Sequence, residues 1–421
     1  ASVAAPTQSG SLTFNGSPQS PSWSGYDTGK MTLGGTTTGT NAGSYNATFT
    51  PGANYKWSDG STGAKTVVWR IGKAAGSLSL NKTSMKLTAA KKTDTITVTR
   101  AGDGVITATS NASGVASVSV SGNTVTVTAK AKGKATITVS VAAGTNHNAP
   151  ANKTCSVEVT MPTKNLSENS WATIREASSA GLGANYWAVG DMKEITINGK
   201  VGNHTFSNLK INVFIIGFNH NASKEGNNLI HFQIGKMGTT AVALCDSQYN
   251  SSGSSAGFRM NTSNTNSGGW NGSYMRKTLL GNTGTPTSPI SNSMMAALPS
   301  DLRAVMQSVT KYTDNTGGGS DNASYVTATK DYLFLLAEFE AFGTRYGANS
   351  AEQNYQLQYD YYKAGNSRVA YNHSAVSTAV GWWLRSPNYS YSNHFRRVYT
   401  DGSNHGDSAY YSGGLRPGFT V

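Results

Sequence analysis

The sequence 381-GWWLRSP-387 and the chain end 413-GGLRPGFTV-421 enclose a segment of unusual composition. Residues 388–413 read NYSYSNHFRRVYTDGSNHGDSAYYSG and contain no Lys, Glu, Gln, Met or Trp. A codon that ends in a pyrimidine encodes every amino acid except these same five. The segment is therefore consistent with a run of codons that all end in C or T.

Tyr, Ser, Asn and Gly dominate this segment, as they do in antibody paratopes. Tyrosine supplies contact area with few rotatable bonds, and the small polar residues supply adaptable hydrogen bonds. Clustered exposed aromatic residues usually mark a recognition surface. We therefore predict a ligand-binding face at residues 388–412. The alternative is a passive polar loop that continues the composition of residues 247–273.

Composition places the chain among modular, β-rich proteins. A chain of 421 residues is too long for one ordinary core, and only 13% of its residues are charged. The net charge of +13 comes largely from lysines dispersed along strand-like sequence between Lys65 and Lys134. We interpret them as solubilising charges on strands, so we expect no nucleic-acid partner. There is no apolar run long enough to span a membrane, so no membrane insertion is expected.

Residues 8–73 alternate apolar and polar side chains between turn signals, which predicts a β-sandwich. Large aromatic residues are expected to fill its small core: Trp23, Tyr45, Phe49, Trp57 and Trp69. The stretches GTNAGSYNATFTP and YKWSDGSTGAKTVVWRI resemble a bacterial Ig-like module of surface and phage proteins, which implies a spacer.

Residues 75–160 predict a second β-sandwich. Apolar side chains recur with a period of two, and Gly122–Asn123 fits a two-residue hairpin turn. SGNTVTVTAKAKGKATITV resembles the group-2 bacterial Ig-like domain, again a spacer.

From residue 164 the pattern changes to mixed helices and strands. Ser167 is expected to cap a short helix that carries Trp171 and Ile174 on one face and ends at Gly181. A helical pair interrupted by proline is expected at 293–313. Strands are expected in KEITING, KINVFIIGFNH and LIHFQIG, and long loops at 247–270 and 313–329.

The third segment contains VGDMKEITING, FIIGFNH, GGWNGSYMRKTLL, LPSDLRAVMQSVTK, DYLFLLAEFEAFG, GWWLRSP and GGLRPGFTV, in this order. Together these stretches resemble the C-type-lectin-fold domain of bacterial and phage surface proteins, in the branch related to formylglycine-generating enzymes. The expected fold class is thus a β-rich multidomain chain, with two Ig-like β-sandwiches followed by an α+β C-type-lectin-like domain at 164–421.

This resemblance implies that the WWLRSP and LRPGF strands hold 388–413 at both ends. Arg385 and Arg416 are expected to donate to loop carbonyls, and Gly413 and Gly414 to occupy tight backbone positions. The residues expected to form the frame are Trp270, Trp382, Trp383, Leu384, Arg385, Phe395, Val398, Leu415, Arg416 and Phe419.

The segment between the brackets resembles the variable region of diversity-generating retroelement proteins, in which adenine-directed mutagenesis rewrites a ligand-binding face on a lectin-like frame. The predicted ligand-binding residues are Asn388, Tyr389, Ser390, Tyr391, Ser392, Asn393, His394, Arg396, Tyr399, Asp401, Ser403, Asn404, His405, Asp407, Tyr410 and Tyr411. The resemblance implies a phage tail-fibre tip or a bacterial surface adhesin. Its partner would be a protein or glycan receptor on a host or environmental surface, and a homotrimer would add avidity. A structural or glycan-binding surface protein without diversification is the alternative.

No catalytic, cofactor or metal site is predicted. Formylglycine-generating enzymes use a cysteine pair, whereas Cys155 and Cys245 lie in different predicted domains. The calcium-binding motifs of sugar-binding lectins are absent. His220 and His231 are expected to form ordinary hydrogen bonds, and Glu338 and Glu340 to pair with arginines or backbone amides.

Overall fold

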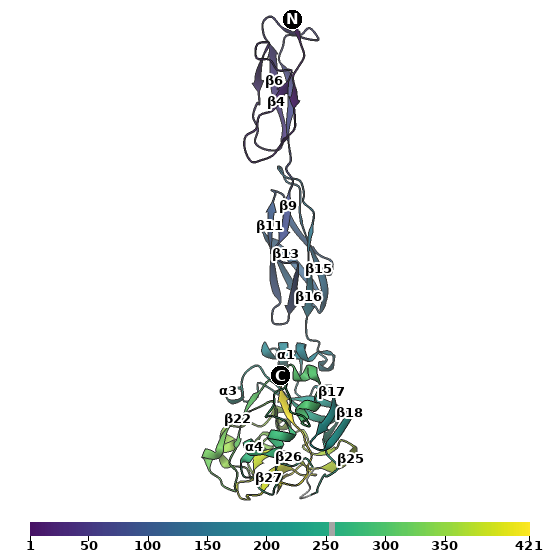
Figure 1. The fold of residues 1–421 in the computed structure, drawn as a ribbon, viewed down its shortest axis with the longest axis vertical. Helices are drawn as coiled ribbons and strands as arrows, with labels where there is room; N and C mark the ends of the chain where they lie inside the picture. The colour runs from purple at the N-terminus through teal and green to yellow at the C-terminus, as the bar shows by residue number, and fades with distance from the viewer. Residues whose placement is uncertain (252–256) are drawn as a thin grey trace. The chain divides into compact units, whose positions relative to one another are not determined.

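The computed structural model describes residues 1–251 and 257–421. The chain divides into two compact units, Ala1–Met161 and Pro162–Val421. Unit 1 contains only strands, and unit 2 mixes strands with short helices (Figure 1). The protein is therefore β-rich and modular, with Ig-like β modules first and a mixed α/β region after them.

The first module of unit 1 is built on the four-stranded sheet β3-β8-β6-β5. Phe49, Trp57 and Trp69 are fully buried in its core, as expected for large aromatic residues. Trp23 packs edge-on against Phe49, and Tyr45 stacks on Trp69 with ring centroids 4.6 Å apart. Its strands are β1 (Ser2–Val3), β2 (Thr7–Ser9), β3 (Leu12–Thr13), β4 (Ser22–Ser24), β5 (Met31–Gly35), β6 (Gly43–Pro51), β7 (Lys56–Trp57) and β8 (Lys65–Gly72).

The second module is a β-sandwich of two four-stranded sheets, β10-β16-β15-β12 and β13-β14-β11-β9. Gly122 and Asn123 form the turn between β13 and β14, as predicted, and Gly122 has a positive φ of 54°. Cys155 is buried here, in a different unit from Cys245. The strands are β9 (Ser77–Leu80), β10 (Ser84–Thr88), β11 (Thr93–Ala101), β12 (Ile106–Ser110), β13 (Ala116–Ser121), β14 (Thr124–Ala129), β15 (Gly133–Val141) and β16 (Lys153–Thr160).

Unit 2 is built around one eight-stranded sheet. In this sheet the C-terminal strand β29 pairs with β19 and β23. The three predicted strands correspond to β17, β18 and β19. A separate meander, β26-β27-β28, lies at the end of the unit away from α1 (Figure 1). The strands are β17 (Met192–Val201), β18 (His204–Phe218), β19 (Ile230–Met237), β20 (Thr240–Ala243), β21 (Val309–Asp314), β22 (Val326–Asp331), β23 (Leu333–Phe334), β24 (Ala370–Asn372), β25 (Ala375–Val380), β26 (Trp382–Pro387), β27 (His394–Val398), β28 (Asn404–Ser408) and β29 (Gly418–Thr420).

The helices of unit 2 are short. They are α1 (Trp171–Ser179), α2 (Gly183–Tyr186), α3 (Ala222–Glu225), α4 (Gly269–Gly272), α5 (Met294–Ala297), α6 (Ser300–Arg303), α7 (Glu338–Phe342) and α8 (Asp360–Lys363). Tighter or wider helical turns occur at η1 (Leu166–Glu168), η2 (Met275–Leu279), η3 (Ala323–Tyr325) and η4 (Ser350–Asn354). With such short helices, the stability of the unit depends on tertiary packing rather than on helix propensity.

The predicted helical pair at 293–313 is wrong in its second half. Helix α6 ends at Arg303, and Val309 begins strand β21 instead of continuing the helix. β21 pairs with β22, so strands also occupy both ends of the predicted loop 313–329. Ladder hydrogen bonds and burial on a sheet override a short helical period. Of the other predicted loop, residues 252–256 lie outside the described residues.

The predicted cap of α1 is also wrong. Ser170 precedes the helix and its hydroxyl accepts a hydrogen bond from the Thr173 amide at 3.1 Å. Ser167 lies one turn earlier, in η1, where its hydroxyl donates to Asn165. Gly181 follows the helix with a φ of 70°, which agrees with its predicted role as terminator.

Replacing Ser170 with alanine is expected to lower the free energy of unfolding of unit 2 by about 1 kcal/mol, because an N-terminal amide of α1 loses its acceptor. Urea denaturation followed by tryptophan fluorescence measures this change. Ser167→Ala is the matched control and should cost less than about 0.5 kcal/mol. A larger loss for Ser167→Ala than for Ser170→Ala would contradict the assignment.

Candidate functional site

Strand β26 is buried on both faces and anchors the meander. The indole N–H of Trp382 donates to the Arg368 carbonyl, and that of Trp383 donates to the Phe258 carbonyl, both at 2.9 Å. A Cβ on Gly413 would lie 2.7 Å from the Trp383 ring nitrogen, so the backbone passes close to the indole there. All the predicted frame residues are buried: Trp270, Trp382, Trp383, Leu384, Arg385, Phe395, Val398, Leu415, Arg416 and Phe419.

The predicted ligand-binding residues divide by exposure. The exposed ones are Ser390, Tyr391, Ser392, Tyr399, Asp401, Ser403 and His405. The half-buried ones are Tyr389, Asn393, His394, Asn404, Asp407, Tyr410 and Tyr411. The exposed members lie mostly in two turns, 388–393 and 399–403, which connect the strands of the meander. A ligand could therefore reach them without disturbing the frame.

These turns lie at opposite ends of β27, so the tyrosines do not form one cluster. A five-residue strand separates its ends by about 15 Å. At one end Tyr391 stacks on His394 with ring centroids 5.1 Å apart, and at the other end Tyr399 stacks on His405 at 5.0 Å. The predicted face therefore carries two aromatic patches, which we name the Tyr391 patch (Tyr391 and His394) and the Tyr399 patch (Tyr399 and His405).

Two predicted ligand contacts point inward instead. Asn388 is only 4% exposed, and its side-chain oxygen accepts from the amide and hydroxyl of Ser390. Arg396 is 8% exposed and its Nε donates to Glu338 at 2.6 Å. The Asn388 side-chain oxygen and the Arg396 guanidinium therefore hold the turn and the meander in shape through bonds within the protein.

Asn266 supports the Tyr391 patch from below, and the sequence carried no signal for it. It is fully buried, and its amide nitrogen lies within hydrogen-bonding distance of the carbonyls of Asn388, Tyr391 and His394 at 2.9–3.1 Å. Its side-chain oxygen accepts from the Gly318 amide at 2.7 Å. One buried amide therefore fixes the path of the whole turn. It belongs to a Gly/Ser/Asn-rich stretch in which no single Asn stands out.

Glu338 fastens a neighbouring loop to the meander. Its carboxylate accepts from the amides of Tyr346, Gly347 and Ala348 and from Arg396. The loop contacts the first turn of the meander: the Gly347 carbonyl accepts from the Tyr389 amide at 2.9 Å, and the Arg345 guanidinium lies 4.4 Å from the centre of the Tyr389 ring. The expectation that Glu338 pairs with arginine and backbone amides is confirmed.

A charge network lies under the meander. Arg385 makes a two-pronged ion pair with Glu340, and also donates to the Leu335 carbonyl at 2.9 Å. A carboxylate, not a loop carbonyl, is thus its main partner. Lys311 donates to Glu225 at 2.7 Å, to Glu340 at 3.1 Å and to the Tyr359 hydroxyl at 2.7 Å, which uses all three of its donors. Burial alone would raise the pKa of Glu340, but Arg385 and Lys311 outweigh burial and hold that pKa below its usual range.

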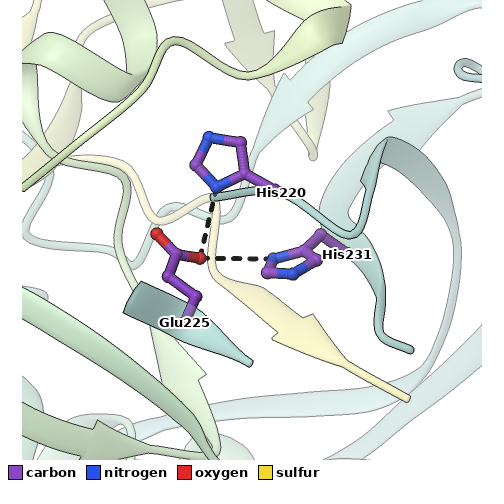
Figure 2. A group of neighbouring side chains, drawn as sticks. All are labelled: His220, Glu225 and His231. Carbon is purple, nitrogen blue, oxygen red and sulfur yellow. Dashed lines mark hydrogen bonds and ion pairs between the residues drawn. The ribbon is translucent and has the colours of Figure 1, made fainter. Parts of the chain in front are cut away.

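Figure 2 shows His220 and His231 directed at the same carboxylate oxygen of Glu225, and their Nδ1 atoms lie 3.2 and 3.8 Å from that oxygen. These residue types could ligate a metal ion. However, the Lys311 ammonium lies 2.7 Å from that oxygen and already neutralises it. Burial, followed by the charge of Lys311, holds the pKa of His231 well below its usual value, so Lys311 and not His231 supplies the counter-charge of Glu225. The arrangement therefore favours a structural network over a metal centre.

Glu352 is buried between the loops and β26. Its carboxyl accepts from the Asp314 amide at 3.0 Å, the Ser386 hydroxyl at 2.6 Å and the Gln356 amide at 3.0 Å. These hydrogen bonds only partly offset burial, which raises its pKa to about 7. The carboxyl therefore changes its charge near neutral pH.

Among protein families, a match is found for the C-terminal part of the chain. Residues 245–421 match the family described as Domain of unknown function (DUF6273). No curated protein matches the chain.

Among solved structures, 36 chains match parts of this chain, and two of them serve as examples. One is the S-layer protein SbsC domains 4 and 5, with 23% identity over 28% of this chain and 58% of that one, at a TM-score of 0.17. The other comprises the fibronectin(III)-like modules of Clostridium thermocellum CbhA, with 14% identity over 37% of this chain and 91% of that one, at a TM-score of 0.18. The chain thus spans little more than half of the S-layer fragment. Such low scores carry no argument about function.

The raised pKa of Glu352 predicts a pH-dependent stability. Below about pH 4.5 the carboxyl is protonated in both the folded and the unfolded chain. Between about pH 4.5 and 7 only the folded chain keeps the proton, so stability falls as the pH rises, by about 3 kcal/mol in total. Urea denaturation at pH 5 and pH 8 measures this loss. In Glu352→Gln the loss of stability between pH 5 and pH 8 should be smaller, because the titrating carboxyl is gone. An equal loss in the variant and the parent protein would refute the raised pKa of Glu352.

Asn266→Ala is expected to loosen the turn at 388–394, because the carbonyls that it serves lose a buried donor, at a cost of about 1–3 kcal/mol. Hydrogen exchange of the turn amides should accelerate locally. Asn282, which bonds the Leu333 backbone in a similar way, is the matched control. Asn282→Ala should destabilise unit 2, but hydrogen exchange of the amides at 388–394 should not accelerate more than that of the other amides of the unit. Equal local effects would exclude a dedicated role for Asn266.

Proposed function

We propose that unit 2 is a ligand-binding domain that recognises a surface receptor through the Tyr391 and Tyr399 patches. The observation that carries this proposal is the contrast within 388–412: exposed Tyr, Ser, Asp and His side chains alternate with buried residues of a rigid meander. Tyr391 is 58% exposed and Tyr399 is 42% exposed, although large aromatic side chains are usually buried. Each ring stacks on a histidine, which limits its freedom and lowers the entropy lost on binding.

The same contrast supports diversification of the face. Substitution of exposed turn residues removes no core contact, whereas Phe395 and Val398 fill the interior between them. A variable sequence is therefore compatible with one fold, as the resemblance to retroelement variable proteins implies. On this proposal, Asn388 and Arg396 belong to the frame.

The separation of the patches supports a receptor contact with two anchor points. Each patch offers one exposed tyrosine, so a single contact would be modest. Several copies on one particle, for example as a homotrimer, would raise the avidity. We place the protein on a virion tail or a bacterial cell surface, with the β modules of unit 1 as spacers. No helix in the part of the chain that the structure describes is long and apolar enough to cross a membrane.

On this proposal the protein binds and does not catalyse. Burial raises the pKa of the Cys245 thiol to about 12, so the thiolate that a cysteine-based oxidation needs is disfavoured. Cys155 lies in the other unit and supplies no partner thiol in this one. Metal analysis of the purified protein tests the catalytic alternative, which requires stoichiometric metal.

Tyr391→Ala and Tyr399→Ala are expected to change the free energy of unfolding by less than about 1 kcal/mol, because both side chains are exposed. Phe395→Ala, between them, should cost about 3–5 kcal/mol through the cavity it leaves. Binding of the labelled full chain to candidate host cells should drop in the two tyrosine variants. Retained binding in a Tyr391→Ala/Tyr399→Ala double variant would refute the proposed face.

Diversification has a separate genomic test. A near-copy of the codons for 383–418, with adenine wherever the copies differ, should lie beside a reverse-transcriptase gene. If the source genome contains no such copy, the face is that of an ordinary adhesin and the mutagenesis hypothesis fails.

A further inference from the structure

A cavity of about 420 Å³ opens on unit 2, and the proposed receptor face does not use it. His220 lines the cavity and connects it, through Glu225, to Lys311 of the charge network. Its walls are the end of β18 with the turn that follows, the C-terminal end of α7, and residues 357–363 around the start of α8. Small-molecule sites typically enclose roughly 300–1,000 Å³. The cavity is thus large enough for a small ligand.

The back wall is pre-formed. His220 is 5% exposed, and its ring nitrogens lie 2.9 Å from the Leu357 carbonyl and 3.2 Å from Glu225. Next to it, the Asn221 side chain donates to the Tyr355 carbonyl at 2.6 Å. These bonds tie the turn after β18 to the segment before α8, so the wall does not have to be ordered when a ligand binds. Pre-organisation of this kind favours binding.

Several polar groups in the wall are unused. Asp360 and Lys363 lie one turn apart on α8, and neither side chain makes a hydrogen bond or ion pair within residues 1–251 and 257–421. The side-chain oxygen of Asn219 accepts from the Leu229 amide, which leaves its NH₂ group available. Phe218 and Phe339, both half-buried, add carbon surface. The cavity therefore offers the Asp360 carboxylate as acceptor, the Lys363 ammonium and the Asn219 NH₂ group as donors, and two aromatic rings.

We propose that this cavity binds a neutral saccharide. Sugar hydroxyls both donate and accept, so one molecule can donate to the Asp360 carboxylate and accept from Lys363 and Asn219. The C–H groups of a sugar ring can pack against the phenylalanine rings. The opposite charges of Asp360 and Lys363 lie three residues apart, so together they give the cavity no net preference for an anion or a cation. An apolar ligand would leave all three polar groups without partners. This site is independent of the receptor face, so each can fail without the other.

The test uses the full chain and a panel of neutral mono- and disaccharides, including glucose, galactose, N-acetylglucosamine, maltose and cellobiose. Saturation-transfer NMR identifies binders, and titration calorimetry gives their affinity. At least one sugar should bind, and Asp360→Asn/Lys363→Gln should weaken it about tenfold or more, because charged hydrogen-bond partners are lost. Both residues are exposed, so the fold should be retained.

The matched control replaces another exposed acid and lysine of unit 2, Glu194→Gln/Lys210→Gln, on β17 and β18. This variant and Tyr391→Ala should bind the sugar like the parent protein. The proposal is overturned if no sugar in the panel binds, if the α8 double variant binds as well as the control, or if only free amino acids, added as zwitterionic competitors, occupy the cavity.

Discussion

Two glutamates of one short helix hold the candidate face in place. Glu340 of α7 pairs with Arg385 of β26, and Glu338 of the same helix pairs with Arg396 of β27. Both carboxylates are fully buried, so each would carry a large desolvation cost without its guanidinium partner. Removing one partner of such a pair costs about 3–5 kcal/mol. The position of the meander relative to α7 is therefore strongly determined.

The wider network extends this constraint across unit 2. Lys311 of β21 joins Glu340 to Glu225 of α3, so the helix that holds the meander is tied to the turn after β18. The two positive charges of Lys311 and Arg385 balance those two carboxylates. Balanced, hydrogen-bonded charges in a core specify one arrangement of elements more sharply than apolar packing does, because a shifted arrangement would strand a charge. The receptor face and the α8 cavity lie on structures that this one network connects.

Sequence reasoning correctly predicted the elements whose conformation is determined by residues close together in the chain. Strand-like stretches located β17, β18 and β19, period-two alternation located the strands of the second β module, and a Gly-Asn pair located the turn at Gly122. It failed at Val309, where a helical spacing lies in a strand, because ladder pairing with β22 decides the conformation. It also gave no indication that the exposed tyrosines of 388–411 lie in two turns at opposite ends of β27, since the positions of the turns in a meander depend on strand pairing and not on composition.

The sequence by itself determined that the chain has β modules followed by a mixed domain, that bulky aromatic residues bracket 388–413, and that Glu338 and Glu340 meet arginines or amides. Each of these follows from side-chain chemistry or from spacing along the chain. Only the tertiary structure decided that Asn388 and Arg396 point inward, that Asn266 holds the turn, and that the exposed tyrosines form two patches. Arg396 and Asn266 owe their positions to partners more than 50 residues away, Glu338 and the turn at 388–394, and no local pattern encodes such contacts. The burial of Asn388 and the separation of the tyrosines follow from how the paired strands of the meander place the turns between them.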